Sequence, residues 1–152
     1  MDPDILSRPV GFLVGDIARL LRRRFERALA QTDTGLTASE ARTLAFIEHY
    51  PHFRQGALAE RLGVEPMTLS GVLDRLEAAG YVERRPDPGD RRAKCVVLTD
   101  AAQGVLERIH EVAIGIRAAA LDGMSDEEGK LAYALLARIH DNLSSVSEPE
   151  RK

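Results

Sequence analysis

The chain has 152 residues, 44% of them hydrophobic and 30% charged, with one cysteine and a net charge of −3. This composition fits one globular domain over residues 1–152 and excludes a wholly disordered chain, a disulfide-stabilised chain and, since no apolar run approaches roughly 20 residues, a membrane-spanning chain. Because the acidic N-terminus does not resemble a secretory signal and a single cysteine is typical of a reducing compartment, we expect a cytoplasmic protein with no membrane partner.

Two helices are predicted in the first third of the chain. Pro9 begins a run in which apolar residues recur every three or four positions, and Gly35 ends it. Thr37 and Glu40 have the spacing of a capping box, in which each side chain bonds the backbone N–H of the other residue. This pair predicts a second helix, which stops before Pro51.

A helix-turn-helix is predicted in the next segment. A short helix over residues 55–62 ends at Gly63, and another begins at Pro66, which suits a first helical turn, and stops at Gly80. Two short helices joined by a few residues that include glycine are typical of this motif. The apolar residues expected to fill the wedge between the helices are Leu58, Leu62, Val64, Leu69, Leu73 and Leu76.

A β-hairpin with a basic turn follows. Residues 81–85 and 93–98 are β-prone, and residues 86–90 between them form a turn rich in proline and glycine. Since local charge governs attraction to phosphate, the basic residues of this hairpin predict a nucleic-acid contact in an acidic chain, with an ordinary solvated hairpin as the alternative. These basic residues are Arg84, Arg85, Arg91, Arg92 and Lys94.

Two long helices close the chain. Thr99 is placed to cap a helix over residues 100–121, and Ser125 and Glu128 form a second capping box before a helix that runs to about residue 144. The apolar faces of the first, fifth and sixth helices are too broad to be buried within one small protomer. We therefore expect an obligate homodimer built on the helices of residues 8–35 and 100–146, with a monomeric helical bundle as the alternative.

These elements predict a fold that is mainly α with a small β-hairpin wing: a winged helix-turn-helix of six helices. Its DNA-binding lobe is expected over residues 36–99, with double-stranded DNA as the partner. In this fold the N-terminal end of the second helix of the motif enters the major groove. The residues predicted to contact DNA from this helix are Pro66, Met67, Thr68, Ser70, Gly71 and Arg75.

The charged residues of this lobe have more than one interpretation. Arg75 contacts a phosphate or pairs with an acid such as Asp90 or Glu77, and the sequence favours neither. In the wing, Arg91 or Arg92 is expected to enter the minor groove. Asp90 repels phosphate, so its expected role is to orient these arginines. The other DNA contacts predicted in the hairpin are Arg84 and Lys94.

A longer run resembles a known family. Residues 73–102 read LDRLEAAGYVERRPDPGDRRAKCVVLTDAA, and this order of LDRLE helix, GYVERR strand, DPGDRR turn and LT cap resembles the MarR family of bacterial regulators, nearer its SlyA-like branch. The resemblance implies a transcriptional regulator, expected to be a repressor, that binds a near-palindromic DNA site as a homodimer. Relatives often carry arginine in place of Gly71, so base discrimination here is expected to depend more on Thr68, Ser70 and the wing.

The resemblance also implies a small phenolic or carboxylate ligand, bound between the dimer helices and the DNA-binding lobe, that releases the DNA. Arg19, Arg22 and Tyr50 are the candidate ligand residues, because an arginine fork suits a carboxylate. The alternative is that these arginines are solvated or pair across the dimer with acids such as Asp16 and Glu26.

The other reactive residues predict no further site. Cys95 lies on a wing strand and is expected to be structural, with redox sensing as the alternative. The four histidines lack a cluster of metal ligands, and the sequence has no phosphate-binding loop, nucleophile elbow or HExxH motif. We therefore predict no metal, no cofactor and no enzymatic activity. The competing function is a winged-helix protein-interaction module without specific DNA binding, which Gly71 and the acidic total charge favour slightly.

Overall fold

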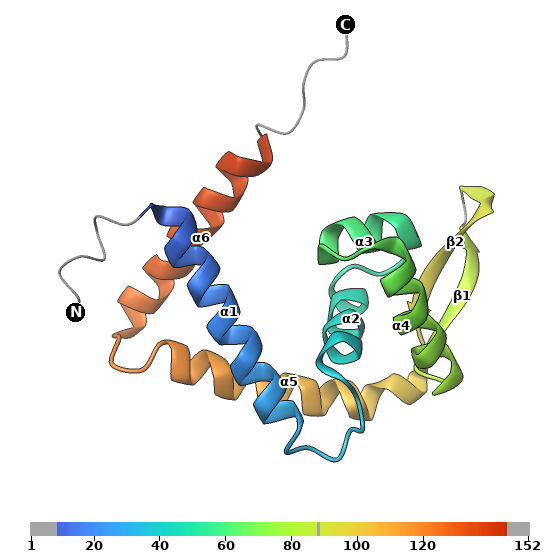
Figure 1. Ribbon diagram of the computed structural model, residues 1–152, viewed down its shortest axis with the longest axis horizontal. Coiled ribbons are helices and arrows are strands. Elements are labelled where there is room, and N and C mark those ends of the chain that lie inside the picture. The colour runs from blue at the N-terminus through green and yellow to red at the C-terminus, as the bar shows by residue number, and fades with distance from the viewer. Residues whose placement is uncertain (1–8, 88, 146–152) are drawn as a thin grey trace, which may run out of the picture. The chain divides into compact units, whose positions relative to one another are not determined.

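The protein is mainly helical, with one small hairpin (Figure 1). The computed structural model describes residues 9–87 and 89–145, apart from the side chains of residues 90–93 and 145. Within these ranges it contains six α-helices and a two-stranded antiparallel sheet, which confirms the predicted winged helix-turn-helix fold. The helices are α1 (Val10–Leu29), α2 (Ala38–His49), α3 (Gln55–Leu62), α4 (Pro66–Ala78), α5 (Gln103–Ala120) and α6 (Asp126–Ser145), and the strands are β1 (Val82–Asp87) and β2 (Asp90–Leu98).

The chain divides into two compact units, Met1–Ile116 and Arg117–Lys152. The core of the first unit lies between α2, α3, α4, the hairpin and the beginning of α5. Of the residues predicted for the wedge between α3 and α4, Leu62 and Val64 are partly buried against this core and the others are fully buried. The largest fully buried apolar side chains include Leu44, Ile47, Leu58, Leu69, Leu73, Leu76, Val82, Val96 and Ile109.

Both predicted capping boxes are present. At the start of α2, the Glu40 N–H donates to Thr37 Oγ1 at 3.3 Å, and the Thr37 N–H donates to Glu40 Oε2 at 2.8 Å. At the start of α6, the Ser125 N–H donates to Glu128 Oε2 at 2.8 Å, and the Glu128 N–H donates to Ser125 Oγ at 3.3 Å. Each box bonds backbone N–H groups that the first helical turn leaves without a partner, so each fixes where its helix begins.

The turn between α3 and α4 depends on one glycine. Gly63 has φ 64° and ψ 38°, in the left-handed region that is costly for a residue with a side chain. Pro66 is the first residue of α4, where its missing N–H costs no hydrogen bond. α4 then buries Leu69 and Leu73 in the core and leaves its opposite face to solvent.

The hairpin is longer than predicted. The pairing of β1 with β2 continues to Asp87 opposite Asp90, so both strands extend into residues that were expected to form the turn. A register shift between Pro86 and Asp87 permits this extension, because proline donates no hydrogen bond to a ladder and is tolerated at bulges. Pro86 and Asp87, which were predicted to lie in the turn, therefore belong to an irregular part of β1.

The segment before α3 pairs with β2 as well. The Val96 N–H donates to the Phe53 carbonyl at 3.2 Å, and Arg54 and Cys95 form an isolated antiparallel bridge. β1 packs beside α4 (Figure 1). The hairpin is thus attached to both helices of the helix-turn-helix.

Thr99 does not cap α5, contrary to the prediction. Its hydroxyl donates to the Gly80 carbonyl at 2.5 Å, and its N–H donates to the Tyr81 carbonyl at 3.0 Å. The chain reverses at Gly80, whose φ is 79°, and this reversal offers Thr99 a partner outside its own helix. Residues Asp100–Ala102 form a 3-10 turn, and α5 begins at Gln103.

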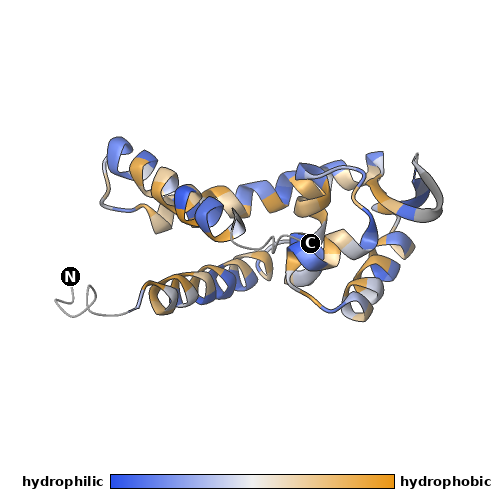
Figure 2. Ribbon diagram, turned by 90° about the horizontal axis from the view of Figure 1, so that it is seen from above, coloured by the Kyte–Doolittle hydropathy of each residue, from blue (hydrophilic) through white to orange (hydrophobic). Residues whose placement is uncertain are grey.

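α1 and α6 each expose apolar side chains, and Figure 2 shows hydrophobic residues recurring along α1. Those exposed on α1 are Val10, Phe12, Val14, Ile17, Leu20 and Leu21. Those exposed on α6 are Leu131, Tyr133, Leu135, Leu136, Ile139 and Leu143. Val10, Val14, Ile17 and Leu21 are three or four positions apart and so lie on one face of α1, and an exposed apolar face of this kind is typical of an interaction site. Among the described residues, no helix combines the length and the hydropathy needed to cross a bilayer.

Candidate nucleic-acid interface

The N-terminal half of α4 exposes Met67 and several short side chains to solvent. Met67 is 83% exposed, and Pro66 and Thr68 are also exposed. Ser70 and Gly71, nearer to the core, are half-buried. Because the other face of α4 is packed into the core, these residues project from a rigid support. They are the residues for which the sequence predicts contact with base edges.

Arg75 pairs with an acid, as one of its two interpretations expected, but the acid is Glu40 of α2, which the sequence did not suggest. Its Nε donates to Glu40 Oε1 at 2.6 Å, and the side chains of Arg75 and Glu40 are 60% and 8% exposed. Burial alone would raise the pKa of Glu40, but hydrogen bonds from Arg75 and Thr37 outweigh burial and lower that pKa below its ordinary value. The Glu40 carboxylate is therefore charged and accepts from both α4 and the cap of α2.

The guanidinium of Arg75 lies beside Gly71. A Cβ built on Gly71 would be 3.8 Å from Arg75 Nη1, which is an ordinary contact distance. Long side chains in helices point back toward the N-terminus, so the charge of Arg75 lies about one turn before its own Cα. The positive charge thus reaches the surface formed by the first turns of α4.

Arg84 lies in an internal ion cluster, although the sequence placed it among the DNA contacts. Its Nη2 donates to Asp74 at 2.6 Å, its Nη1 donates to Glu77, and its side chain is only 15% exposed. Burial would lower the pKa of Arg84, but the bonds to Asp74 and Glu77 outweigh burial and raise it. The Arg84 side chain therefore joins β1 to α4, and Arg84 is not among the proposed DNA contacts.

An ion pair also braces the base of the wing. Arg54 Nε donates to Asp87 Oδ2 at 3.1 Å, and Arg54 Nη2 donates to Asp87 Oδ1 at 3.2 Å. Asp87 Oδ1 also accepts from the Gly89 N–H at 2.9 Å. No local pattern in the sequence predicts this bidentate pair, because its members are 33 positions apart.

From Asp90 to Ala93, the wing is described only in its backbone. Asp90, Arg91 and Arg92 lie at the start of β2, but their side chains are outside the described part of the structure. Lys94 is exposed on the same strand. The DNA contacts expected from Arg91, Arg92 and Lys94, and the orienting role expected of Asp90, therefore stay predictions.

A cavity of about 420 Å³ lies beside the C-terminal half of α2. Tyr50, predicted as a ligand residue, lines this cavity, whereas Arg19 and Arg22 do not. Arg19 instead pairs with Asp16 of its own chain at 2.8 Å, on exposed α1, so the acid is one that the alternative named, whereas pairing across a dimer stays a prediction. The other lining residues are Phe25, Arg42, Ala45, Phe46, His49, Arg61, Leu62, Ile109, His110 and Ala113.

The cationic and aromatic groups of this cavity are adjacent. The guanidinium carbon of Arg61 lies 5.6 Å from the centre of the Tyr50 ring and 5.7 Å from that of Phe53. Phe46 and Tyr50 stack with ring centres 4.6 Å apart. Such a lining suits a flat ring with a negative charge.

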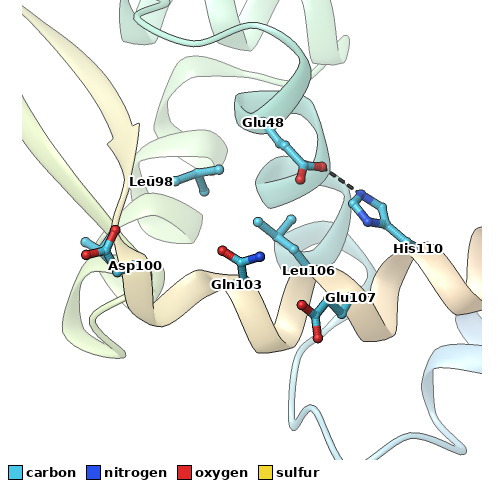
Figure 3. Close-up of a pocket in the computed structure, with 8 residues that line it drawn as sticks. Glu48, Leu98, Asp100, Gln103, Leu106, Glu107 and His110 are labelled. Carbon is cyan, nitrogen blue, oxygen red and sulfur yellow. Dashed lines mark hydrogen bonds and ion pairs between the residues drawn. The ribbon is translucent and has the colours of Figure 1, made fainter.

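A second cavity, of about 290 Å³, has a different character (Figure 3). Figure 3 shows Glu48 of α2 facing His110 of α5, and the Nε2–Oε2 distance is 2.7 Å. Asp100 and Glu107 also line this cavity, and none of the described residues in its lining is a lysine or an arginine. The cavity therefore does not suit an anion.

Cys95 occupies a structural position. It is 2% exposed, and its Sγ lies 3.6 Å from the Arg85 carbonyl of the paired strand. Within the part of the chain that the structure describes, no group of three or more histidine, cysteine or acidic side chains is arranged to hold a metal.

The chain is similar in sequence and in structure to known proteins. Residues 34–93 match the MarR family. The transcriptional regulator PA3341 is 33% identical over 90% of this chain and 99% of its own, with a TM-score of 0.74. Wild-type MarR from E. coli in its apo form is 26% identical over 87% and 96% of the two chains, with a TM-score of 0.73. A mutant MarR from E. coli complexed with operator DNA is 25% identical over 91% and 99%, with a TM-score of 0.70.

Proposed function

This chain belongs to the MarR family, and we propose that it is a homodimeric transcriptional regulator that binds a pseudo-palindromic site in duplex DNA. The observation that carries the proposal is α4, whose exposed N-terminal half projects from a packed helix-turn-helix. A relative that matches 91% of this chain has been solved with operator DNA, which supports the same kind of partner here. The lobe of residues 36–99 is the proposed DNA-binding part.

The proposed base contacts come from the first two turns of α4. The hydroxyls of Thr68 and Ser70 are short enough to bond base edges when the helix end enters the major groove. Pro66 and the exposed Met67 can contact a thymine methyl group. Selectivity is then modest for each residue, because none of these side chains forms a bidentate pair with a base.

The proposed contribution of the wing is general affinity. Arg91 and Arg92 enter the minor groove, where the potential is most negative when the groove is narrow. Lys94 adds a phosphate contact, and Asp90 orients the arginines. Contacts of this kind make binding fall steeply with salt concentration.

The proposed dimer is built on the helices of residues 8–35 and 100–146. Its support is the apolar surface of α1 and α6, on which Phe12 is 71% exposed and Leu143 is 69% exposed. A second copy of the chain would remove this surface from water. A dimer also matches the two-fold symmetry of a pseudo-palindromic site.

The proposed ligand is a small aromatic carboxylate held in the cavity beside α2. In this proposal Tyr50 offers the ring contact, and Arg42 and Arg61, which line the cavity, take the role predicted for Arg19 and Arg22. A ligand that binds better to a form of the dimer unsuited to DNA would release the operator. On this basis, and on the DPGDRR turn, we assign the chain to the SlyA-like branch and expect it to repress.

Selection of bound fragments from a random duplex pool tests the proposal. Enriched palindromes with half-sites about one helical turn apart are the expected result. The control is the double variant Arg91→Ala, Arg92→Ala, which should enrich weakly and show a flatter salt dependence. If the wild-type chain enriches no sequence, the interaction-module alternative replaces the regulator.

A further inference from the structure

The Glu40 carboxylate fixes the orientation of Arg75. Arg75 Nε donates to Glu40 Oε1 at 2.6 Å, and the Thr37 N–H donates to Glu40 Oε2 at 2.8 Å. The Glu40 side chain is 8% exposed, so this acceptor is itself held in place. An arginine bonded through Nε to a fixed acceptor has lost much of its rotamer freedom before any ligand arrives.

Gly71 leaves the space into which the guanidinium extends. The position of a Cβ at residue 71 lies 3.8 Å from Arg75 Nη1, and apart from the backbone of α4 and the two neighbouring residues, no other heavy atom of the described residues is within 4 Å. Thr68, Gly71 and Arg75 are three and four positions apart on α4 and lie along one face. With no side chain at Gly71, the charge of Arg75 occupies the part of this face that would point into the groove.

The outer edge of the guanidinium is available for a ligand. Nε is used by Glu40, the side chain is 60% exposed, and no described group accepts a hydrogen bond from Nη1 or Nη2. These two nitrogens form a planar fork. Such a fork matches O6 and N7 of guanine, which is the commonest specific contact in the major groove.

We propose that Arg75, held by Glu40 across Gly71, determines base specificity by recognising one guanine in each half-site. The inference rests on the proposed DNA-binding function and adds a base contact to the short side chains of Thr68 and Ser70. A phosphate contact would need the same charge but neither the fixed orientation nor the open space above Gly71. The proposal therefore predicts a loss that depends on sequence.

A cycle that combines protein variants with base substitutions tests this. In wild type, replacing the selected guanine pair by an A·T pair should lower affinity by about 5-fold to 150-fold. Arg75→Ala and Arg75→Lys should reduce this factor to about 2-fold or less, because neither side chain presents the fork. Thermal unfolding of each variant, and its affinity for the A·T site, establish that the fold and general binding are retained.

Two substitutions at Gly71 provide a matched pair. Gly71→Ala adds a Cβ at an ordinary contact distance, so the guanine preference should persist. Gly71→Leu fills the space of the guanidinium and should abolish the preference while helix propensity stays favourable. If the two variants show the same guanine preference, whether retained or lost, the proposal is overturned.

The remaining outcomes separate this inference from the proposed function. If Arg75→Ala weakens binding equally on every sequence and lowers the salt slope by about one, Arg75 is a phosphate contact. If the wild-type chain selects palindromes and Arg75→Ala selects the same ones, the inference fails while the regulator assignment stands. If the wild-type chain selects nothing, both fail.

Discussion

At the scale of single residues, Glu40 connects two helices. Its carboxylate accepts from the cap of α2 and from Arg75 of α4, and it is almost inaccessible to water. A buried carboxylate of this kind is stabilising only while it is charged and both donors are present. Protonation of Glu40 therefore weakens both the cap of α2 and the ion pair that joins α2 to α4.

The pH dependence of stability follows from the lowered pKa of Glu40. Below its ordinary value of 4.5 the unfolded chain binds this proton before the folded chain does, so the stabilisation is present above pH 4.5 and is lost as the pH falls through the folded pKa. Glu40→Gln should lower the melting temperature at pH 7, and its difference from wild type should shrink below pH 4. Thermal unfolding by circular dichroism measures this, with the exposed Glu60→Gln as control. A difference that stays constant down to pH 3 would contradict the assignment.

Arg84 and Arg85 are adjacent arginines with different surroundings. Arg84 is mostly buried between Asp74 and Glu77, whereas Arg85 is exposed and pairs with Glu83. Arg84→Ala should lower the free energy of unfolding by about 1.5–3 kcal/mol, because it leaves charged hydrogen bonds unmade. Arg85→Ala, the matched control, should change it by less than about 0.5 kcal/mol. Urea unfolding of both variants measures this, and equal losses would show that the cluster does not anchor the strand.

At the scale of elements, the turn of the helix-turn-helix depends on backbone conformation. Gly63→Ala should cost about 1–2 kcal/mol, because the left-handed conformation is strained for any residue with a Cβ. Gly56→Ala in the neighbouring helix α3 meets open space and should be neutral or stabilising. Chemical denaturation of the two variants measures the contrast. Equal stability of the two variants would mean that the turn adopts another, unstrained conformation in Gly63→Ala.

The sequence predicts most elements because their boundaries are set by local chemistry. Gly63, Pro66 and the Thr37–Glu40 pair act within one or two turns of the chain, and each predicted boundary was confirmed. Thr99 was mispredicted because its partner, Gly80, is 19 positions away. The pairing of Arg75 with Glu40 was missed for the same reason: 35 positions separate them, and only the packing of α4 against α2 brings them together.

At the scale of the whole molecule, the apolar surfaces predict the oligomeric state. Light scattering at micromolar concentration should give twice the 16.7 kDa mass of one chain. Leu135→Glu places a charge among exposed apolar residues of α6 and should yield monomers, since burying an unpaired charge is costly. Lys130→Glu, on the opposite and polar side of exposed α6, is the control and should stay dimeric. A monomeric wild type would refute the dimer.

The cavity proposed to hold a ligand likewise forms only in the assembled fold. Tyr50 could be proposed from the sequence, but Arg42 and Arg61 come beside it only when α2 and α3 pack together. Arg61→Ala should abolish release of DNA by benzoate, whereas Arg19→Ala, away from the cavity, should retain it. Fluorescence anisotropy of labelled operator DNA measures both. A normal response of Arg61→Ala would exclude this arginine.

The position of Cys95 allows the opening of the hairpin to be followed by thiol labelling. It is the only thiol of the chain, and it is buried where β2 meets both β1 and the segment before α3. A thiol reagent reaches it only when the hairpin separates from those neighbours, so the rate of labelling counts such openings under native conditions. Comparing that rate with and without bound DNA would measure how firmly the operator holds the wing, with no engineered probe.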